Sequence, residues 1–371
     1  MPRGLRIGLI GPLPPPSGGM ANQTEQLARL LEQEGAHVEV VQTNAAYRPA
    51  WIGSVRVARA LCRLVPYLVR LWHAAGRMDL FHVMANSGWA WHLCAAPAVW
   101  IAKSRGLPVV VNYHGGSAER FFARSLLPVR FTMRLADRVV VPSAYLQQVF
   151  ARFRMAAHVI PNVVDSSRYS HGASGPASRR GAPNLVVARN LEPVYDIGTA
   201  VRALAIVRRT RPRARLTVAG SGPDRDALEQ LAATLGVSAD VTFTGTLDAD
   251  GMAALYREAD LFLNPSLVDN MPVSILEAWA SGVPVVSTNV GGIPLLVEHG
   301  RTGLLVPPRS PEAMARAALE LLDEEDKAQR LARAGREAAQ RYGWQRVRGT
   351  LLELYAGLMR RVPENRAVEA E

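Results

Sequence analysis

The feature that most constrains the fold is a regular alternation of short apolar, β-branched runs with longer segments of helical spacing. Each run has the length of a strand that is buried on both faces, and most are followed by a helical stretch. This alternation favours a parallel sheet with helices on both of its faces. In the first half of the chain the predicted strands are Leu5–Ile10, Val38–Val41, Leu80–Met84, Val109–Asn112, Val139–Val141 and His158–Ile160.

The alternation stops once and then restarts. Residues 165–184 are rich in Ser, Gly, Ala, Pro and Arg, which predicts a linker. Because 371 residues exceed the usual size of one hydrophobic core, we expect two Rossmann-like domains. Beyond Pro311 the pattern is helical to about Arg361, and a frayed polar tail is expected from Pro363. The second series of predicted strands includes Leu185–Ala188, Arg215–Ala219, Val241–Thr244, Leu261–Asn264 and Val283–Ser287.

Charge is distributed unevenly along the chain. Through Asp165 there are 18 Lys and Arg against 8 Asp and Glu, whereas the remainder has 25 against 24. A basic half suits an anionic partner, either nucleic acid or a membrane with acidic lipids, and no nucleic-acid motif accompanies it. Two cysteines favour a reducing compartment, and the proline-rich start is too short for a signal peptide or span, so we expect a cytoplasmic protein.

The strongest functional signal lies between Asn264 and Thr288. A predicted strand ends in a loop that carries Asp269, and Pro272 is expected at the first helical position with Asn270 as its cap. A helix N-terminus offers free N–H groups to a diphosphate, so Asn270, Met271, Pro272 and Val273 are predicted donor-binding residues. Glu277 is placed to reach ribose hydroxyls and Asp269 to reach a sugar. The alternative is that these acids only cap a helix and face solvent.

This segment resembles the acidic signature of the retaining family-4 glycosyltransferases, in which two carboxylates eight residues apart precede Glu-Ala-x-Ala-x-Gly-x-Pro-Val-Val. Here the motif runs from Asp269 through Glu277-Ala278-Trp279-Ala280-Ser281-Gly282-Val283-Pro284-Val285-Val286. The resemblance implies the GT-B fold, an α/β architecture of two Rossmann-like domains facing a cleft. The first acid of the family is usually Glu followed by Gly, so Asp269 and Asn270 depart from the pattern.

The family's Gly-Arg motif, which contacts the donor phosphates, resembles Ala188-Arg189. Arg189 is therefore a predicted catalytic and donor-binding residue, because a guanidinium pairs bidentately with a diphosphate. The alternative for an Arg that follows a strand is a surface salt bridge. The family usually adds a Lys five or six residues later, and residues 192–196 contain none.

Three further segments match the family. Gly220 and Gly222 follow a predicted strand, where glycines let the backbone approach a ligand or a neighbouring strand. Gly18 and Gly19 occupy the first strand-to-helix loop, which suggests contact with the donor, or alternatively simple loop flexibility. His114 follows a predicted strand and matches the family's His-Gly, which contacts the transferred sugar, although a lone His is more often structural.

The resemblance extends over nearly the full chain. Residues 161–165 are similar to the family's interdomain hinge, and Gly343-Trp344 opens a segment like its closing helix. It implies an acceptor-binding domain of residues 1–164, a nucleotide-sugar-binding domain of residues 165–343, and a C-terminal helix of residues 344–371 that joins the first domain.

The expected reaction is transfer of a hexosyl group from UDP- or GDP-sugar to a glycan or lipid-linked acceptor with retention. The departing diphosphate accepts the acceptor's proton while fixed positive groups stabilise it. No His, Cys and acid cluster has metal-ligand spacing, so the prediction is no metal and no cofactor.

Residues 55–77 have a helical pattern in which five arginines fall on one stripe, with Pro66 expected to kink the helix. One interpretation is contact with an anionic membrane that carries a lipid-linked acceptor. The other is an ordinary helix that exposes its arginines to water. The stripe consists of Arg56, Arg59, Arg63, Arg70 and Arg77.

Two other functions stay open. Sugar-nucleotide 2-epimerases share the two-domain architecture, although Arg189 together with the segment from Asp269 to Glu277 favours transfer. A non-catalytic nucleotide-sugar-binding protein is the other alternative, because the phosphate-binding Lys is missing and the first acid is Asp.

Overall fold

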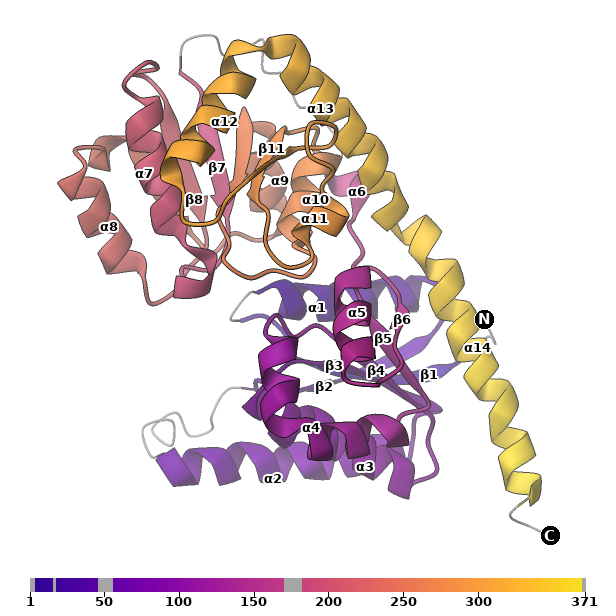
Figure 1. Cartoon of the computed structure of the whole chain (residues 1–371). Coiled ribbons are helices and arrows are strands. Elements are labelled where there is room, and N and C mark those ends of the chain that lie inside the picture. Colours follow the sequence, from indigo (N-terminus) through magenta and orange to yellow (C-terminus); the bar gives the residue numbers. More distant parts are fainter. Residues whose placement is uncertain (1–3, 16–17, 46–55, 170–181, 369–371) are drawn as a thin grey trace. The chain divides into compact units, whose positions relative to one another are not determined.

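The computed structural model describes residues 4–15, 18–45, 56–169 and 182–368, with the backbone alone for 56–61, 166–167 and 361–368 (Figure 1). The chain divides into two compact units. Unit 1 comprises Met1–Asn162 and Val347–Glu371, and unit 2 comprises Val163–Arg346. Most of the predicted linker, residues 170–181, lies outside the described residues.

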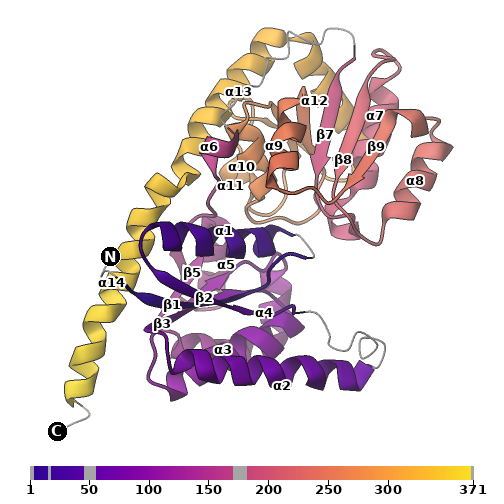
Figure 2. The same cartoon turned by 180° about the vertical axis from the view of Figure 1, so that it is seen from behind.

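Unit 1 is built on a six-stranded sheet in the order β2-β1-β3-β4-β5-β6, and every strand pair in it is parallel (Figure 2). Ile7, Leu9 and Phe81 have no exposed surface, as expected for strands covered on both faces. The strands are β1 (Arg6–Gly11), β2 (His37–Gln42), β3 (Leu80–Ala85), β4 (Val109–Tyr113), β5 (Arg138–Val141) and β6 (His158–Val159).

Helices cover both faces of this sheet, as Figures 1 and 2 show. Helices α2, α3 and α4 form one layer, in which α3 contacts both of the others. α2 continues through Pro66 as one helix. The described helices are α1 (Gly19–Gln33), α2 (Arg56–Ala75), a π-helical turn (Trp91–Ala95), α3 (Ala96–Ser104), α4 (Ala118–Leu135) and α5 (Ala144–Arg152).

The C-terminal helix α14 (Trp344–Val368) buries Val347, Leu351, Tyr355 and Leu358, and its residues from Val347 belong to unit 1. Its buried Tyr355 hydroxyl lies 2.7 Å from Nδ1 of His82, and Arg348 pairs with Glu34 at 3.0 Å. The predicted frayed tail is wrong as far as Val368, because Pro363 removes only one helical hydrogen bond and the helix continues past it. Within the described residues, no helix has both the length and the apolarity needed to cross a membrane.

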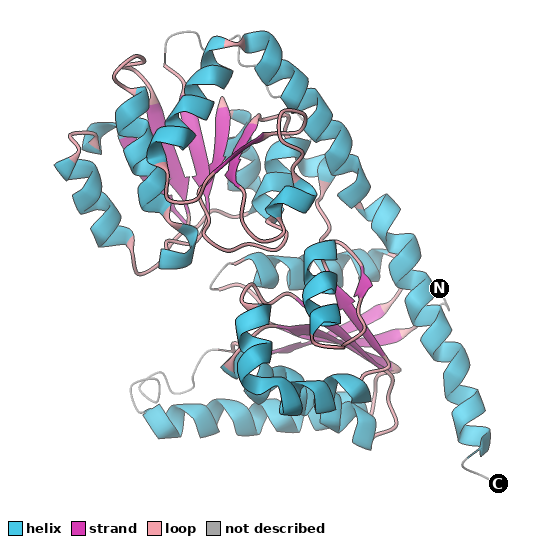
Figure 3. Ribbon diagram, in the orientation of Figure 1, coloured by secondary structure: helices cyan, strands magenta, loops and turns pink. Residues whose placement is uncertain are grey.

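Unit 2 contains a second parallel six-stranded sheet, in the order β12-β11-β10-β7-β8-β9 (Figure 3). Strand β12 was not predicted, because three residues are too few to show a period. The strands are β7 (Asn184–Ala188), β8 (Arg215–Ala219), β9 (Val241–Gly245), β10 (Leu261–Asn264), β11 (Val285–Thr288) and β12 (Leu304–Val306).

Two hydrophobic clusters flank the second sheet, and the fully buried Trp279 and Tyr256 belong to the one that supports the site described below. The helices of unit 2 are α6 (Ser166–Tyr169), α7 (Ile197–Val207), α8 (Arg225–Thr234), α9 (Ala249–Arg257), α10 (Val273–Ala280), α11 (Ile293–Leu296), α12 (Pro311–Asp323) and α13 (Glu325–Ala339), with 3₁₀ turns at Pro193–Tyr195, Ser238–Asp240 and Gln340–Tyr342.

Candidate functional site

The candidate site lies at the carboxyl edge of the unit 2 sheet. Strand β7 ends at Ala188 and β10 ends at Asn264, and these two strands are parallel neighbours. Their carboxyl ends therefore meet at one edge, where open α/β sheets bind ligands. Arg189 follows the first strand and the loop with Asp269 follows the second, so two residues 80 positions apart in sequence are brought into contact.

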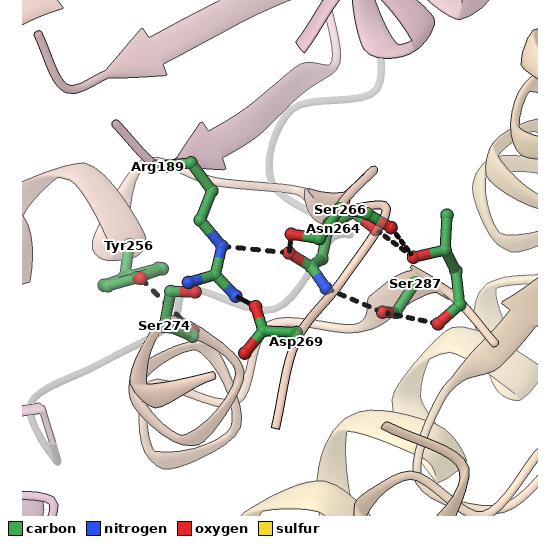
Figure 4. Close-up of polar contacts among 8 residues, drawn as sticks. Arg189, Tyr256, Asn264, Ser266, Asp269, Ser274 and Ser287 are labelled. Atoms are coloured by element: carbon green, nitrogen blue, oxygen red, sulfur yellow. Dashed lines mark hydrogen bonds and ion pairs between the residues drawn. The ribbon is translucent and has the colours of Figure 1, made fainter. Parts of the chain in front are cut away.

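Arg189 is held by one carboxylate and one amide side chain (Figure 4). Its Nη2 donates to Oδ2 of Asp269 at 2.5 Å, and its Nε donates to Oδ1 of Asn264 at 3.0 Å. The Arg189 and Asp269 side chains are each 12% exposed. The ring of Tyr195 lies under the guanidinium, 5.2 Å from its carbon. The fork of Arg189 is thus fixed in direction while part of it stays accessible.

Asn264 connects this arginine to the loops behind it. Its Oδ1 also accepts a hydrogen bond from Ser266 Oγ at 2.9 Å, and its Nδ2 donates to Ser287 Oγ at 2.9 Å. Thr288 Oγ1 donates to the carbonyl of Ser266 at 2.6 Å. Figure 4 shows that these side chains form one chain of contacts behind Arg189. This role of Asn264 was not predicted, although a buried Asn at the end of an apolar strand is a usable signal.

Glu277 lies on α10 between two tyrosines. Tyr169 donates its hydroxyl to Oε1 at 3.1 Å, and Tyr256 donates to Oε2 at 3.0 Å. The Tyr256 hydroxyl also lies 3.2 Å from the carbonyl of Ser274. Both carboxylate oxygens are therefore oriented. These tyrosines come from α6 and α9, and no sequence spacing could have associated them with Glu277.

Burial affects both carboxylates strongly. It raises the pKa of Asp269, while the Arg189 guanidinium opposes the rise together with hydrogen bonds from Asn270 and Ser266. Burial likewise raises the pKa of Glu277, and Tyr256, Tyr169 and Arg189 oppose that rise. Arg189 thus acts on both acids, which places the three side chains in one electrostatic environment.

The start of α10 differs from the prediction. The helix begins at Val273 and Pro272 occupies the N-cap position, so Asn270 is not its N-cap residue. The physical reason is that Pro272 has an extended ψ of 115° and cannot belong to the first turn. Asn270 and Met271 are buried. The first N–H groups of the helix keep the orientation that favours an anion.

The glycines after β8 are explained by their neighbours. A Cβ on Gly220 would collide with the carbonyl oxygen of Arg189, and its φ of +143° also favours glycine. A Cβ on Gly222 would collide with the carbonyl of Leu191. These two glycines let the loop approach the segment that carries Arg189. Their contact with a donor stays a prediction.

Unit 1 contains the remaining predicted residues. His114 follows β4, and its backbone N–H donates to the carbonyl of Ala85 at 2.8 Å. Burial lowers the pKa of its imidazole to about 4. Gly18 is the N-cap residue of α1, and a Cβ on Gly19 would meet open space, so packing does not demand glycine at position 19. Contact of these residues with donor or sugar stays a prediction.

Among the described side chains, no group of three or more His, Cys, Asp or Glu is arranged to hold a metal ion. Positive groups at the carboxyl edge of the unit 2 sheet include Arg189 and the start of α10.

Comparisons with known proteins bear on this geometry. The family profile described as glycosyl transferases group 1 matches residues 176–338, and that of glycosyltransferase family 4 matches residues 17–168. A GDP-mannose-dependent alpha-(1-6)-phosphatidylinositol monomannoside mannosyltransferase of Mycobacterium tuberculosis is 31% identical over 93% of this chain and 96% of its own length. The chain belongs to glycosyltransferase family 4.

Other relatives of this family-4 chain are named for different activities. Glycogen synthase of M. tuberculosis is 31% identical, over 72% of this chain and 67% of its own. Among solved structures, sucrose-phosphate synthase of Thermosynechococcus elongatus has a TM-score of 0.77 at 22% identity, covering 95% of this chain and 99% of its own. Anabaena HepE in complex with UDP-glucose has a TM-score of 0.74 at 22% identity, with coverages of 95% and 99%. The predicted GT-B fold is confirmed.

Proposed function

We propose that this chain is a retaining glycosyltransferase that moves a hexose from UDP- or GDP-sugar to a glycan or lipid-linked acceptor in polysaccharide or glycoconjugate biosynthesis. The observation that carries the proposal is that Arg189, Asp269 and Glu277 share one electrostatic environment at the carboxyl edge of the sheet, beside the start of α10. That edge is where α/β sheets bind nucleotides.

Each group has a distinct role in the proposal. Arg189 and the N-terminus of α10 hold the pyrophosphate and stabilise its charge as it departs. Glu277 accepts hydrogen bonds from the ribose hydroxyls, and Asp269 and His114 contact the transferred sugar. Because burial keeps the imidazole of His114 neutral, it can donate one hydrogen bond to a sugar hydroxyl without adding charge. Fixed positive groups replace a divalent ion, so the reaction is proposed to be independent of metals and cofactors.

The relatives support this proposal in part. The Mycobacterium relative is named for GDP-mannose and a phosphatidylinositol mannoside acceptor, and HepE was solved with UDP-glucose. These names are the reason for keeping both nucleotides in the proposal, and they support the choice of a lipid-linked acceptor. A cytoplasmic location with peripheral membrane contact belongs to the same proposal.

The test is a thermal-shift screen against UDP, GDP and their sugars, because a ligand that binds only the folded protein raises its melting temperature. The sugar that binds is then incubated with glycan and lipid-linked acceptors in the presence of EDTA, and the anomeric configuration of the product is read by NMR. Transfer with retention supports the proposal. Free epimerised donor, inversion, a strict metal requirement, or binding without transfer to any acceptor would each contradict it.

A further inference from the structure

Helix α2 has two apolar faces. Tyr67, Leu71 and Ala74 are buried against the core of unit 1. A second stripe, at the i, i+4 and i+7 positions Val65, Val69 and Trp72, is about half exposed. A helix that covers a sheet needs one apolar stripe, and its other side is normally polar. Of the predicted arginine stripe, the side chains of Arg56 and Arg59 lie outside the described residues.

The exposed apolar surface continues over the neighbouring helices. On α4, Leu127 is 81% exposed and Phe131 is 61% exposed, and on α3 Trp100 is 46% exposed. Two contacts join the helices across this surface. Trp100 Nε1 donates to Thr132 Oγ1 at 3.1 Å, and the guanidinium carbon of Arg105 lies 4.8 Å from the centre of the Trp72 ring. We call the surface formed by Val65, Val69, Trp72, Trp100, Leu127 and Phe131 the α2–α4 face.

The charge of these helices has one sign. Residues 56–75, 96–104 and 118–135 contain nine Arg and Lys and a single acid, Glu119. That acid is paired with Arg152 at 3.1 Å. Exposed arginines of α2 and α4 include Arg70, Arg124 and Arg134, and Arg105, just after α3, is exposed and lies against Trp72.

We propose that the α2–α4 face docks this chain on the surface of an anionic lipid bilayer. Exposed Trp and Phe side chains favour the boundary between headgroups and acyl chains, and arginines beside them reach the phosphates. Each basic residue near an acidic membrane adds to binding. Self-association through this face would bring two strongly basic surfaces together, so the charge disfavours a second copy as the occupant. The proposal rests on the peripheral membrane contact of the proposed function and assigns it to a named surface, and its test is independent of sugar transfer.

The experiment measures co-sedimentation of the full chain with vesicles of phosphatidylcholine alone or mixed with phosphatidylglycerol, at low and high salt. We expect binding to the anionic vesicles alone, weakened by salt. Trp72→Ser combined with Phe131→Ser removes exposed apolar area and should weaken binding at least about tenfold. Arg70→Gln combined with Arg134→Gln should weaken it about tenfold or more on anionic vesicles.

Matched controls come from unit 2. Leu295→Ser removes another exposed apolar side chain, and Arg301→Gln removes another exposed charge, so neither should change sedimentation. Thermal shifts with UDP and GDP, measured on every variant, report folding and donor binding separately from docking. Three results would overturn the proposal: no binding of the wild type to anionic vesicles, equal binding by the apolar-face variant, or a dimer in sedimentation velocity that Trp72→Ser/Phe131→Ser dissolves.

Discussion

The two units present their functional residues in opposite ways. In unit 2, Arg189 donates hydrogen bonds to Asn264 and Asp269, and Glu277 accepts hydrogen bonds from Tyr169 and Tyr256, so these side chains are positioned before any ligand arrives. In unit 1, the most distinctive surface is the α2–α4 face, whose Trp72 and Phe131 side chains extend outward. A preorganised polar site suits a small anionic ligand, whereas an apolar and basic surface suits an extended partner.

The two units also differ in how burial affects their titratable groups. In unit 1 burial lowers the pKa of His82 to about 3 and of His114 to about 4, so both imidazoles are neutral. In unit 2 burial raises the pKa of two carboxyl groups. The cause is the same in both units, because burial disfavours the charged form of a side chain. The predicted change in stability on acidification is nevertheless opposite for histidines and carboxyl groups.

The largest expected effect is that of Arg189→Ala on sugar transfer. Removing one preorganised positive donor from a site of charge development costs about 100- to 1,000-fold in rate. Steady-state kinetics with the donor found by thermal shift would measure it. Arg208→Ala is the control, because Arg208 pairs with Asp240 at 2.6 Å at the opposite edge of the same sheet. Equal losses in the two variants would show that Arg189 only supports the fold.

The next effect is the acid sensitivity of unit 1. A histidine with a lowered folded pKa binds fewer protons when folded, so its stabilising effect is complete above its ordinary value and is lost as pH falls toward the folded value. Each imidazole should remove about 2 kcal/mol of stability between pH 7 and about pH 5, because one pKa unit corresponds to about 1.4 kcal/mol. The window runs from the ordinary value of 6.5 down to about 4 for His114 and about 3 for His82.

Hydrogen exchange resolved along the chain would measure this difference. Amides of β3 and β4 should lose protection in that window. In unit 2 the sign is reversed, since raised carboxyl pKa values make the folded state bind more protons, and stability falls as pH rises above the ordinary values of 3.8 for Asp269 and 4.5 for Glu277. Parallel loss of protection in both units on acidification would contradict the comparison.

Much of the fold was predictable because it depends on local pattern. Buried strands of parallel sheets are continuous β-branched runs. The predicted ends of β1 and β8 lie within one residue of the observed ends. The three residues of β12 and the π-helical turn at Trp91–Ala95 were not, since neither is long enough to show periodicity. Pro272 was placed one residue too far into α10.

The site was predictable only as far as its motif. Asp269, Glu277 and Arg189 were named from sequence, but their partners come from strands and helices distant in the chain. The ion pair of Arg189 with Asp269 needs the pairing of β7 with β10, and the two tyrosines reach Glu277 from α6 and α9. The parts of the α2–α4 face on α3 and α4 were not predicted from the sequence. Which of their apolar side chains stay exposed depends on how α2, α3 and α4 pack against one another.

A third prediction concerns Glu277→Gln. Loss of the charge should weaken donor binding about tenfold, since hydrogen bonds to a charged acceptor exceed neutral ones by about 1 kcal/mol or more. The same change should raise the melting temperature of the free protein at neutral pH, because a buried carboxyl with a raised pKa is destabilising when ionised. Isothermal titration and thermal unfolding measure the two effects.

The exposed acid Glu298 provides the control for that variant, as Glu298→Gln should change neither quantity. A lower melting temperature for Glu277→Gln would mean that the two tyrosines stabilise the carboxylate more than burial destabilises it.

The smallest effect separates the two tyrosines that orient Glu277. The single hydroxyl hydrogen of Tyr256 has two acceptors, Glu277 and the carbonyl of Ser274, whereas the Tyr169 hydroxyl donates to Glu277. Tyr169→Phe should therefore raise the donor KM about threefold with little change in kcat, and Tyr256→Phe should raise it less. Tyr342→Phe, in the same hydrophobic cluster, is the control. If Tyr256→Phe has the larger effect on KM, the Tyr256 hydroxyl donates to Glu277 and not to Ser274. The carboxylate is then oriented mainly from α9 instead of α6.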